Sequence, residues 1–396
     1  MKGKTVVLGV TGGIAAYKSV ELLRLLTKGG ADVHVVMTEA AMEFIAPLTF
    51  QTLSMNPVST SLFNLLSERE IGHISLADRA DLLIIAPATA NIVAKLANGI
   101  ADDMLSTTAM ATKAPILIAP AMNVNMYQNP AYRDNEAKLK ERGVLFVEPV
   151  RGTLACGWEG EGKLQEPAVI YEEALAALCE KDLAGKSLMV TAGPTREEID
   201  PVRFISNYSS GRMGYAIARC ARRRGAEVTL VTGPTAIDKP FGVEVVQVVS
   251  ACEMREAVMS HADNSDIIIK AAAVADYRPA VRAGNKIKKE RAPRTLELVQ
   301  NPDILQELGG VKGERLLIGF AAETGDLLKN ARKKLKGKNL DMVVANDISR
   351  PGAGFDQDTN IVKLLFRDGE VVDLPLMTKD ELADVILDRI VGMKKG

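Results

Sequence analysis

The segment KTVVLGVTGGIAAYKSVELLRLLTKGGADVHVVMT, residues 4–38, decides the expected fold. A β-branched run ends in the turn Thr-Gly-Gly, an amphipathic stretch follows, and a second β-branched run closes the unit. Two apolar strands joined by a helix of period 3.6 form the pattern of a βαβ unit in a parallel sheet. The glycine turn would also place backbone N–H groups at a helix N-terminus, an arrangement suited to a phosphate group.

The same pattern begins a second time at residue 186. KSLMVTAGPT (186–195) is strand-like, GYAIARCARRRGA (214–226) is helical, and EVTLVTGPT (227–235) is again strand-like. Two such beginnings predict an α/β protein with two Rossmann-like parallel-sheet domains. Short continuous apolar runs fit further strands covered on both faces, and they occupy residues 82–88, 115–121, 266–275, 315–323 and 341–347.

The length of the chain supports this division. A chain of 396 residues is expected to form two or three domains. The segment DLAGK (182–186) follows a helical stretch at 169–181 and precedes the second strand-like run. We therefore predict one domain of residues 1–184 and one of residues 185–396.

Composition and charge exclude several classes of protein. Hydrophobic residues make up 47% of the chain and charged residues 25%, as in ordinary globular proteins. The formal net charge of -1 gives no reason to expect a nucleic-acid or membrane partner. No long apolar run predicts a transmembrane helix, and the first residues lack the pattern of a signal peptide. The four cysteines show no CxxC spacing, so a reducing cytoplasmic location is expected.

Three segments stand apart from the strand–helix alternation. Residues 276–301 are polar and basic, and we expect a functional loop or flap there. NIVKLLFRDGEVVDLP (360–375) has a DG turn between apolar alternations, which predicts a β-hairpin. TLACGWEGEG (153–162) is rich in glycine, and we expect it to form neither helix nor strand. The cysteines outside this loop lie in apolar helical contexts and are expected in the core, namely Cys179, Cys220 and Cys252.

Neither glycine turn is a GxGxxG fingerprint. A two-domain NAD-dependent oxidoreductase is therefore disfavoured, because that class needs the fingerprint and a matching acidic residue. FMN, CTP or a phosphorylated substrate would all suit such a turn, which by itself does not distinguish them.

Five motifs of the first half occur in a characteristic order. They are GGIAAYK (12–18), GHISLA (72–77), APATANIVAKLANGIADDMLSTT (86–108), PAMNVNMY (120–127) and ACGWEGEG (155–162). In this order they resemble the flavin-dependent cysteine decarboxylases, specifically the phosphopantothenoylcysteine decarboxylase part of the bifunctional coenzyme A biosynthesis proteins. The resemblance implies a flavodoxin-like flavoprotein domain that converts 4′-phosphopantothenoylcysteine to 4′-phosphopantetheine and CO₂ with FMN.

The resemblance implies catalytic roles for His73, Asn123 and Cys156. Histidine titrates near pH 6.5, so His73 is the candidate base for oxidation of the substrate thiol. Asn123 offers a neutral amide for the substrate carboxylate. The glycine-rich loop would be a flap whose Cys156 donates a proton to the aminoenethiol, while reduced FMN returns hydride. The family usually has arginine where this chain has Lys163, which keeps the charge but lacks the guanidinium fork.

The resemblance also implies an FMN site. It is expected to involve the first glycine turn and several short hydroxyl side chains beside helix starts, whose alternative role is N-capping. These residues are Gly12, Gly13, Thr38, Thr89, Ser106, Thr107 and Thr108.

The second half carries its own series of motifs. They are TAGPTREEIDPVRFISNYSSGRMG (191–214), AAAVADYRP (271–279), NKIKK (285–289), NPDIL (301–305), IGFAAET (318–324) and KKLKGKNLDMVVAND (333–347). This series resembles phosphopantothenate–cysteine ligase, the other part of the same bifunctional family. The resemblance implies activation of 4′-phosphopantothenate by CTP as an acyl-cytidylate, followed by attack of the cysteine amine.

Residue roles follow from this second resemblance. Asn207 should stabilise the acyl-cytidylate, Lys286 should neutralise charge on the reacting group, and Asp276 should contact the nucleotide or its Mg²⁺. The remaining expected CTP contacts are Asn301, Pro302, Asp303, Ile304, Phe320, Lys334 and Lys338.

The resemblance further implies a homo-oligomer. A decarboxylase site built at a subunit contact predicts trimers, and ligase dimers would join them into a dodecamer. The alternative from another functional class is a flavin- and nucleotide-binding regulatory protein of the same fold without catalysis. The presence of all five expected catalytic residues argues against that alternative.

Overall fold

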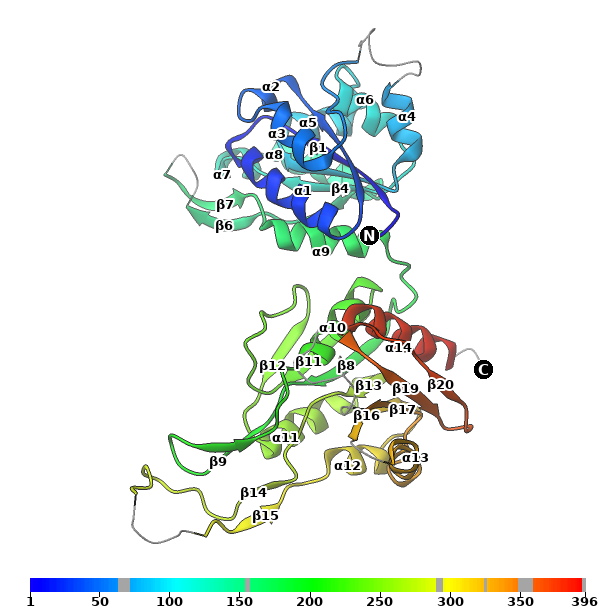
Figure 1. Ribbon diagram of the computed structural model, residues 1–396. Helices are drawn as coiled ribbons and strands as arrows, with labels where there is room; N and C mark the ends of the chain where they lie inside the picture. Colours follow the sequence, from blue (N-terminus) through cyan, green and yellow to red (C-terminus); the bar gives the residue numbers. More distant parts are fainter. Residues whose placement is uncertain (63–71, 154–156, 290–294, 324–325, 348–358, 394–396) are drawn as a thin grey trace. The chain divides into compact units, whose positions relative to one another are not determined.

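The computed structural model describes residues 1–62, 72–153, 157–289, 295–323, 326–347 and 359–393 (Figure 1). The chain divides into two compact units, Met1–Cys179 and Glu180–Gly396. Each unit has its own sheet and its own hydrophobic core.

Unit 1 is built on a five-stranded parallel sheet. The strand order is β2-β1-β3-β4-β5, the flavodoxin-like order, in which ligands bind beyond the carboxyl ends of the strands. This confirms the expected fold class. The strands are β1 (Thr5–Val10), β2 (Asp32–Met37), β3 (Leu82–Ala88), β4 (Ile116–Pro120) and β5 (Leu145–Phe146).

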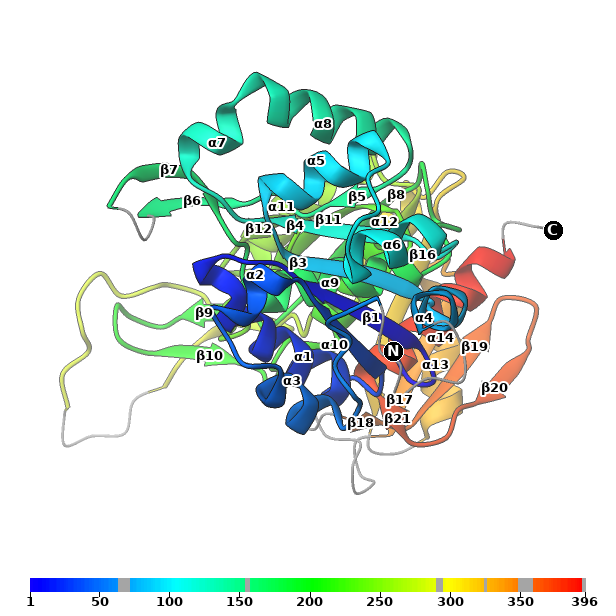
Figure 2. The ribbon, with the colours of Figure 1, turned by 90° about the horizontal axis from the view of Figure 1, so that it is seen from above.

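Helices cover both faces of this sheet (Figure 2). Leu8 of β1 packs with one group of helices, and Val7 on the opposite face packs with the other. Strands covered on both faces read as continuous apolar runs, which is why residues 82–88 contain no polar side chain. One face carries α1 (Lys18–Lys28), α3 (Pro47–Ser54) and α9 (Pro167–Leu178); the other carries α5 (Ala90–Asn98), α6 (Met104–Ala111) and α8 (Pro130–Glu141). Short elements complete the unit: η1 (Ile14–Tyr17), α2 (Glu39–Met42), α4 (Gly72–Arg79) and α7 (Val124–Gln128).

The glycine-rich segment corrects one expectation. Glu159–Lys163 forms strand β7, which pairs antiparallel with β6 (Val150–Thr153), although we expected no strand within 153–162. Gly160 and Gly162 are buried, and the residues between and beside them are exposed. The missing side chains let the strand lie flat against residues 122–124, since an added Cβ on Gly160 would come within 2.6 Å of the Val124 side chain.

Unit 2 is built on an eight-stranded sheet in the order β12-β11-β8-β13-β16-β17-β19-β20. The first six strands run parallel in the Rossmann order, and β19 and β20 add antiparallel at one edge. The parallel strands are β8 (Ser187–Ala192), β11 (Glu227–Thr232), β12 (Glu244–Gln247), β13 (Ile267–Lys270), β16 (Leu316–Glu323) and β17 (Met342–Asp347). The antiparallel pair is β19 (Val362–Phe366) and β20 (Val371–Asp373), which confirms the hairpin predicted from the DG turn.

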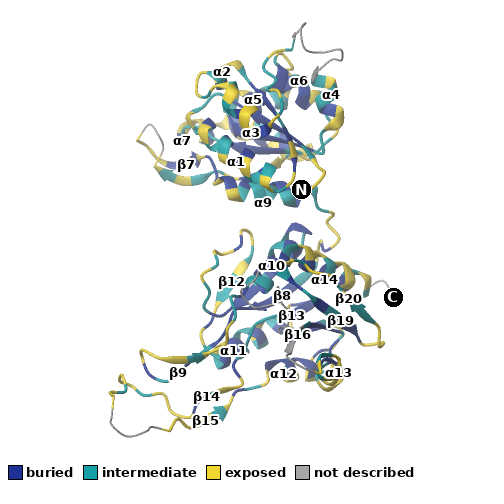
Figure 3. Cartoon of the chain, viewed as in Figure 1, coloured by how far each residue is buried: buried dark blue, intermediate teal, exposed yellow. Residues whose placement is uncertain are grey.

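The helices of unit 2 also lie on both faces of its sheet, and the strands between them are buried (Figure 3). One face carries α10 (Arg212–Arg223) and α14 (Lys379–Met393); the other carries α11 (Ala251–Ala262), α12 (Ile304–Gly310) and α13 (Leu327–Gly337). Two two-stranded ribbons project from this body (Figure 1), namely β9 (Arg196–Glu198) with β10 (Phe204–Ser206) and β14 (Tyr277–Pro279) with β15 (Leu298–Gln300). A further ribbon, β18 (Thr359–Asn360) with β21 (Met377–Thr378), lies against α14.

Two further expectations need correction. The strand expected over 266–275 ends at Lys270, because the chain turns there toward the β14–β15 ribbon. Of the three cysteines expected in the core, Cys220 is buried, whereas Cys252 on α11 and Cys179, the residue after α9, are half-buried. Among the described residues, no helix is long and apolar enough to cross a membrane.

Candidate functional site

Unit 1 has a cavity of about 460 Å³ beyond the carboxyl ends of its strands. Gly12 and Gly13 follow β1, Thr89 follows β3, and Asn123 follows β4. Parallel strands end at the same edge of a sheet, so the topology brings these four predicted residues together around one hollow. Apolar side chains complete the wall, including Ile14, Tyr17 and Met126.

The glycine turn is fixed by close packing and hydrogen bonds. An added Cβ on Gly12 would lie 2.5 Å from the Cβ of Ala40, so only glycine lets the turn approach α2. The hydroxyl of Thr11 donates to the Pro87 carbonyl at 2.7 Å and accepts from the backbone N–H of Thr89 at 3.1 Å. The turns after β1 and β3 are therefore held as one unit.

The predicted hydroxyl residues divide into two groups. Thr89 lines the cavity and also caps α5, since its Oγ1 accepts from the backbone N–H of Ile92. Ser106 forms a capping box with Asp103, Thr107 donates to the Ala101 carbonyl at 3.3 Å, and Thr108 donates to the Met104 carbonyl at 2.7 Å. The structure thus shows the capping and helix-internal contacts for α6, and its three hydroxyl residues do not line the cavity. Their part in cofactor binding stays a prediction.

Two of the predicted site residues in unit 1 each have a buried polar atom with no hydrogen-bond partner among the described residues. The atoms are the hydroxyl oxygen of Thr38 and Nδ1 of His73. A buried polar group without a partner costs about 1–3 kcal/mol. Both positions are therefore suited to a group that the described part of the chain does not itself supply, although neither residue lines the cavity.

Asn123 is held in place at the N-terminus of α7, where it is the N-cap residue. Its Oδ1 accepts a hydrogen bond from the backbone N–H of Asn125 at 2.8 Å, which orients the side-chain amide. Next to it, the backbone N–H of Met122 donates to the Gly162 carbonyl at 2.9 Å, so β7 is fastened to the same turn. His73 lies on α4, which occupies the opposite side of unit 1 from α7 in both views (Figures 1 and 2). Cys156 lies outside the described residues.

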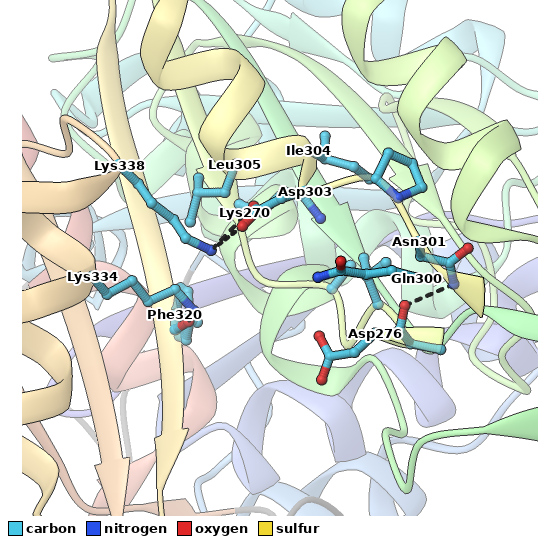
Figure 4. A pocket seen from close by; sticks show the side chains of 14 residues that line it. Lys270, Asp276, Gln300, Asn301, Asp303, Ile304, Leu305, Phe320, Lys334 and Lys338 are labelled. Carbon is cyan, nitrogen blue, oxygen red and sulfur yellow. Dashed lines mark hydrogen bonds and ion pairs between the residues drawn. The ribbon is translucent and has the colours of Figure 1, made fainter. Parts of the chain in front are cut away.

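Unit 2 has a smaller cavity, of about 180 Å³, near the carboxyl ends of β13 and β16 (Figure 4). It brings together eight residues that the sequence predicted, although they come from segments far apart in the chain. They are Asp276, Asn301, Pro302, Asp303, Ile304, Phe320, Lys334 and Lys338.

A larger cleft of about 760 Å³ adjoins this cavity, and Asp276, Phe320 and Lys334 line both. Asn207 and the turn before α10 form its far wall. The Nδ2 amide of Asn207 donates to the Ala273 carbonyl at 3.1 Å, which fixes the side chain against the segment after β13. The structure therefore places Asn207 beside the predicted nucleotide pocket.

Charged groups in the small cavity are arranged in a defined way. Lys338 pairs with the carboxylate of Asp303 at 2.8 Å, and Lys334 donates to the Phe320 carbonyl at 2.6 Å. Burial raises the pKa of Asp303, but hydrogen bonds from Lys338 and from the backbone N–H of Gln306 outweigh it and hold that pKa below its usual value. Asp303 is therefore ionised and also caps α12.

Asn301 connects the pocket to the β14–β15 ribbon. Its buried amide donates to the Ala275 carbonyl at 2.8 Å, and its Oδ1 accepts from Arg278 at 2.9 Å. Lys286, by contrast, is exposed and lines neither cavity. The next residue, Ile287, donates its backbone N–H to the Asp200 carboxylate at 3.1 Å. This hydrogen bond holds residues 286–287 near the β9–β10 ribbon.

Lys270 is a charged residue of the small cavity that was not predicted from the sequence. Lys270 is the last residue of β13, is 7% exposed, and lines the small cavity beside Lys334 and Lys338. Its position was visible as a lysine at the end of the apolar run IIIK, on the edge where parallel strands bind ligands. Among the described residues, no cluster of three histidine, cysteine or acidic side chains could hold a metal ion.

The fold and the two cavities define a two-unit α/β protein with a flavodoxin-like unit and a Rossmann-like unit, each with a cavity near the carboxyl ends of its strands. Residues 1–178 match the family model described as "Flavoprotein". Residues 183–393 match the model described as "DNA/pantothenate metabolism flavoprotein C-terminal domain".

Curated relatives match both units together. The coenzyme A biosynthesis bifunctional protein CoaBC of Bacillus subtilis (strain 168) is 51% identical over 100% of this chain and 98% of its own length. The protein of the same name from Escherichia coli (strain K12) is 48% identical over 99% and 97%. The chain belongs to the family of bifunctional coenzyme A biosynthesis proteins.

Solved structures match the units separately. The C-terminal domain of a CoaBC protein covers 55% of this chain and 99% of its own, with 50% identity and a TM-score of 0.47. A PPC decarboxylase mutant complexed with pantothenoylaminoethenethiol covers 44% of this chain and 97% of its own, with 31% identity and a TM-score of 0.39.

Proposed function

We propose that the chain catalyses two consecutive reactions of coenzyme A biosynthesis. Residues 185–396 activate 4′-phosphopantothenate with CTP as an acyl-cytidylate and join it to cysteine. Residues 1–184 convert the product, 4′-phosphopantothenoylcysteine, to 4′-phosphopantetheine and CO₂ with FMN. The observation that carries this proposal is the 51% identity to a bifunctional relative across both units.

The residues of unit 1 fit FMN. The cavity has apolar walls for a ring system and a glycine turn whose backbone can approach a phosphate. The Thr38 hydroxyl is buried without a partner among the described residues, as expected of a group that meets a ligand. When bound, FMN supplies the two-electron oxidation of the substrate thiol and the later return of those electrons.

The chain's own residues would position the substrate and move its protons. The amide of Asn123, oriented through Asn125, receives the substrate carboxylate without a fixed countercharge that would oppose loss of CO₂. His73 accepts the proton that leaves during oxidation. The thiol of Cys156, which lies outside the described residues, donates the proton that completes the product.

We also propose that this site is shared between copies of the chain. His73 lies on α4 and Asn123 caps α7, and these two helices lie on opposite sides of unit 1 in both views (Figures 1 and 2). Large apolar side chains are exposed on η1 and around α3, with Tyr17 62% and Leu48 69% exposed. Contiguous exposed apolar surface marks an interaction site, and a trimer-based homo-oligomer would cover it.

Mixing inactive variants tests the shared site. His73→Asn and Asn123→Asp chains are each expected to be inactive in decarboxylation. Co-expression of the two in one oligomer should restore part of the activity, because some contacts would combine an intact His73 with an intact Asn123. A mixed oligomer as inactive as its parents would refute a site shared between copies.

The geometry of unit 2 supports the proposed ligase site. Lys334 and Lys338 offer positive charge to the CTP phosphates, and Asp276 offers a carboxylate at the junction of the two cavities. Mg²⁺ usually binds through one or two carboxylates together with substrate phosphates, which suits Asp276 and a metal ion carried by CTP. Asn207 stabilises the acyl-cytidylate by hydrogen bonding. Lys286, in the polar segment 276–301, neutralises negative charge on the reacting group.

A coupled assay tests the whole proposal. Purified protein is incubated with 4′-phosphopantothenate, cysteine, CTP and Mg²⁺, and pyrophosphate, CO₂ and 4′-phosphopantetheine are followed by mass spectrometry. All three products are expected. A sample that binds FMN and CTP but forms none of them would instead identify a regulatory protein of the same fold.

A further inference from the structure

Lys270 is a buried lysine that forms no ion pair among the described residues. It closes β13 with 7% of its surface exposed, and the hydrogen bond that its Nζ makes is to the Met254 sulfur at 4.0 Å. A thioether is a weak acceptor. Within the described residues no carboxylate forms an ion pair with Lys270, and an isolated buried ammonium group is costly.

None of the described charged side chains that line the cavity with Lys270 forms an ion pair with its amine. Lys334 and Lys338 face the same cavity from the α13 side, Asp303 faces it from the start of α12, and Asp276 from the segment after β13 (Figure 4). Asp303 is already paired with Lys338. Burial first, and then repulsion from Lys334 and Lys338, lowers the pKa of Lys270 to about 7, with Asp303 opposing.

We infer that Lys270 is a further nucleotide-binding residue of the ligase cavity, and that its amine takes up a proton when the anionic nucleotide enters. This inference rests on the proposed ligase function. The phosphates of CTP supply a countercharge for Lys270, which forms no ion pair among the described residues, and the ammonium form is then favoured. The balance is simple: the neutral amine gains one proton from solvent and becomes ammonium, and no other bond changes.

The proposed proton uptake makes the affinity for CTP depend on pH. Below about pH 7 Lys270 is already charged, so binding needs no proton and the affinity for CTP is constant. Above that pH each binding event must also take up a proton. The affinity should then fall as pH rises, by up to about tenfold per pH unit. The terminal phosphate titrates near pH 6 and does not change charge in this window.

Calorimetry on the full-length protein measures this proton directly. CTP and Mg²⁺ are titrated at pH 8 in HEPES and in Tris, without 4′-phosphopantothenate or cysteine, so no turnover occurs. A group with a pKa of about 7 is roughly nine-tenths neutral at pH 8, so wild type should take up about 0.9 proton per CTP bound. Lys270→Met should lose this uptake and its dependence on pH.

Lys329→Met is the matched control, because this exposed lysine lies on α13 outside the cavity. It should behave as wild type. Equal proton uptake by wild type and Lys270→Met would overturn the inference while leaving the ligase function intact. Failure of wild type to bind CTP would overturn the ligase function itself. If Lys270→Met does not fold, the wild-type profile decides: an affinity for CTP that is unchanged between pH 7 and pH 8.5 refutes proton uptake.

Discussion

Replacing Gly162 by alanine should disable decarboxylation by moving the turn that holds Asn123. Gly162 lies on β7 with φ of 138°, a backbone conformation that is essentially restricted to glycine and costs other residues about 1–3 kcal/mol. An added Cβ would also lie 2.3 Å from the Met122 carbonyl oxygen. Carbon–oxygen contacts are ordinarily no closer than about 3.3 Å, so one of the two backbones must move by about 1 Å.

This displacement would move residues 122–123, the turn after β4 that contains Asn123. The Gly162 carbonyl accepts from the backbone N–H of Met122, the residue before Asn123, so the strand and the turn move together or separate. Misplacement of a positioning group by 1 Å can cost about a hundredfold in rate. We therefore expect the rate of CO₂ release from 4′-phosphopantothenoylcysteine to fall about a hundredfold or more in Gly162→Ala.

The same sample provides its own control. Pyrophosphate release by the ligase unit should be unchanged, since the substitution lies in unit 1. Gly152→Ala is the matched variant in the paired strand β6, where an added Cβ would meet its nearest neighbour, the Lys163 side chain, at an ordinary 3.7 Å. It should keep nearly wild-type decarboxylation. If Gly162→Ala retains more than half of the wild-type rate, the packing of β7 does not position Asn123.

Three further outcomes are expected from the two sites. His73→Asn should abolish CO₂ release and leave pyrophosphate release unchanged; loss of ligation in a variant that stays assembled would contradict independent sites. Lys286→Gln should release little pyrophosphate even without cysteine, whereas Asn207→Asp should form the acyl-cytidylate but consume it about a hundredfold more slowly. Quenched-flow measurements with labelled CTP distinguish these two defects. Equal loss of both half-reactions in both variants would refute the division of roles between Lys286 and Asn207. Asn301→Leu leaves the Ala275 carbonyl unpaired at a cost of about 1–3 kcal/mol, so the KM for CTP should rise about tenfold with unchanged CO₂ release, and an unchanged KM would show that this amide does not shape the pocket.

The sequence by itself determined the elements and the family. Continuous apolar runs such as 82–88 and 341–347 predicted buried parallel strands correctly, because a strand covered on both faces leaves no room for alternating polar residues. The DG turn predicted the hairpin of β19 and β20, because its geometry is local. The ordered motifs identified the bifunctional family for the same reason, since each is a short contiguous string.

Only the tertiary structure decided what depends on contacts between distant segments. The glycines at positions 160 and 162 predict a loop from the sequence alone. In the structure they form part of a strand that lies close against residues 122–124, where no side chain would fit between the two backbones. Likewise, Lys270 is the last residue of an apolar run in the sequence, and burial beside Lys334 and Lys338 lowers the pKa of its amine. Charge, burial and close approach depend on distances across the fold, and a local pattern of residue types does not contain those distances.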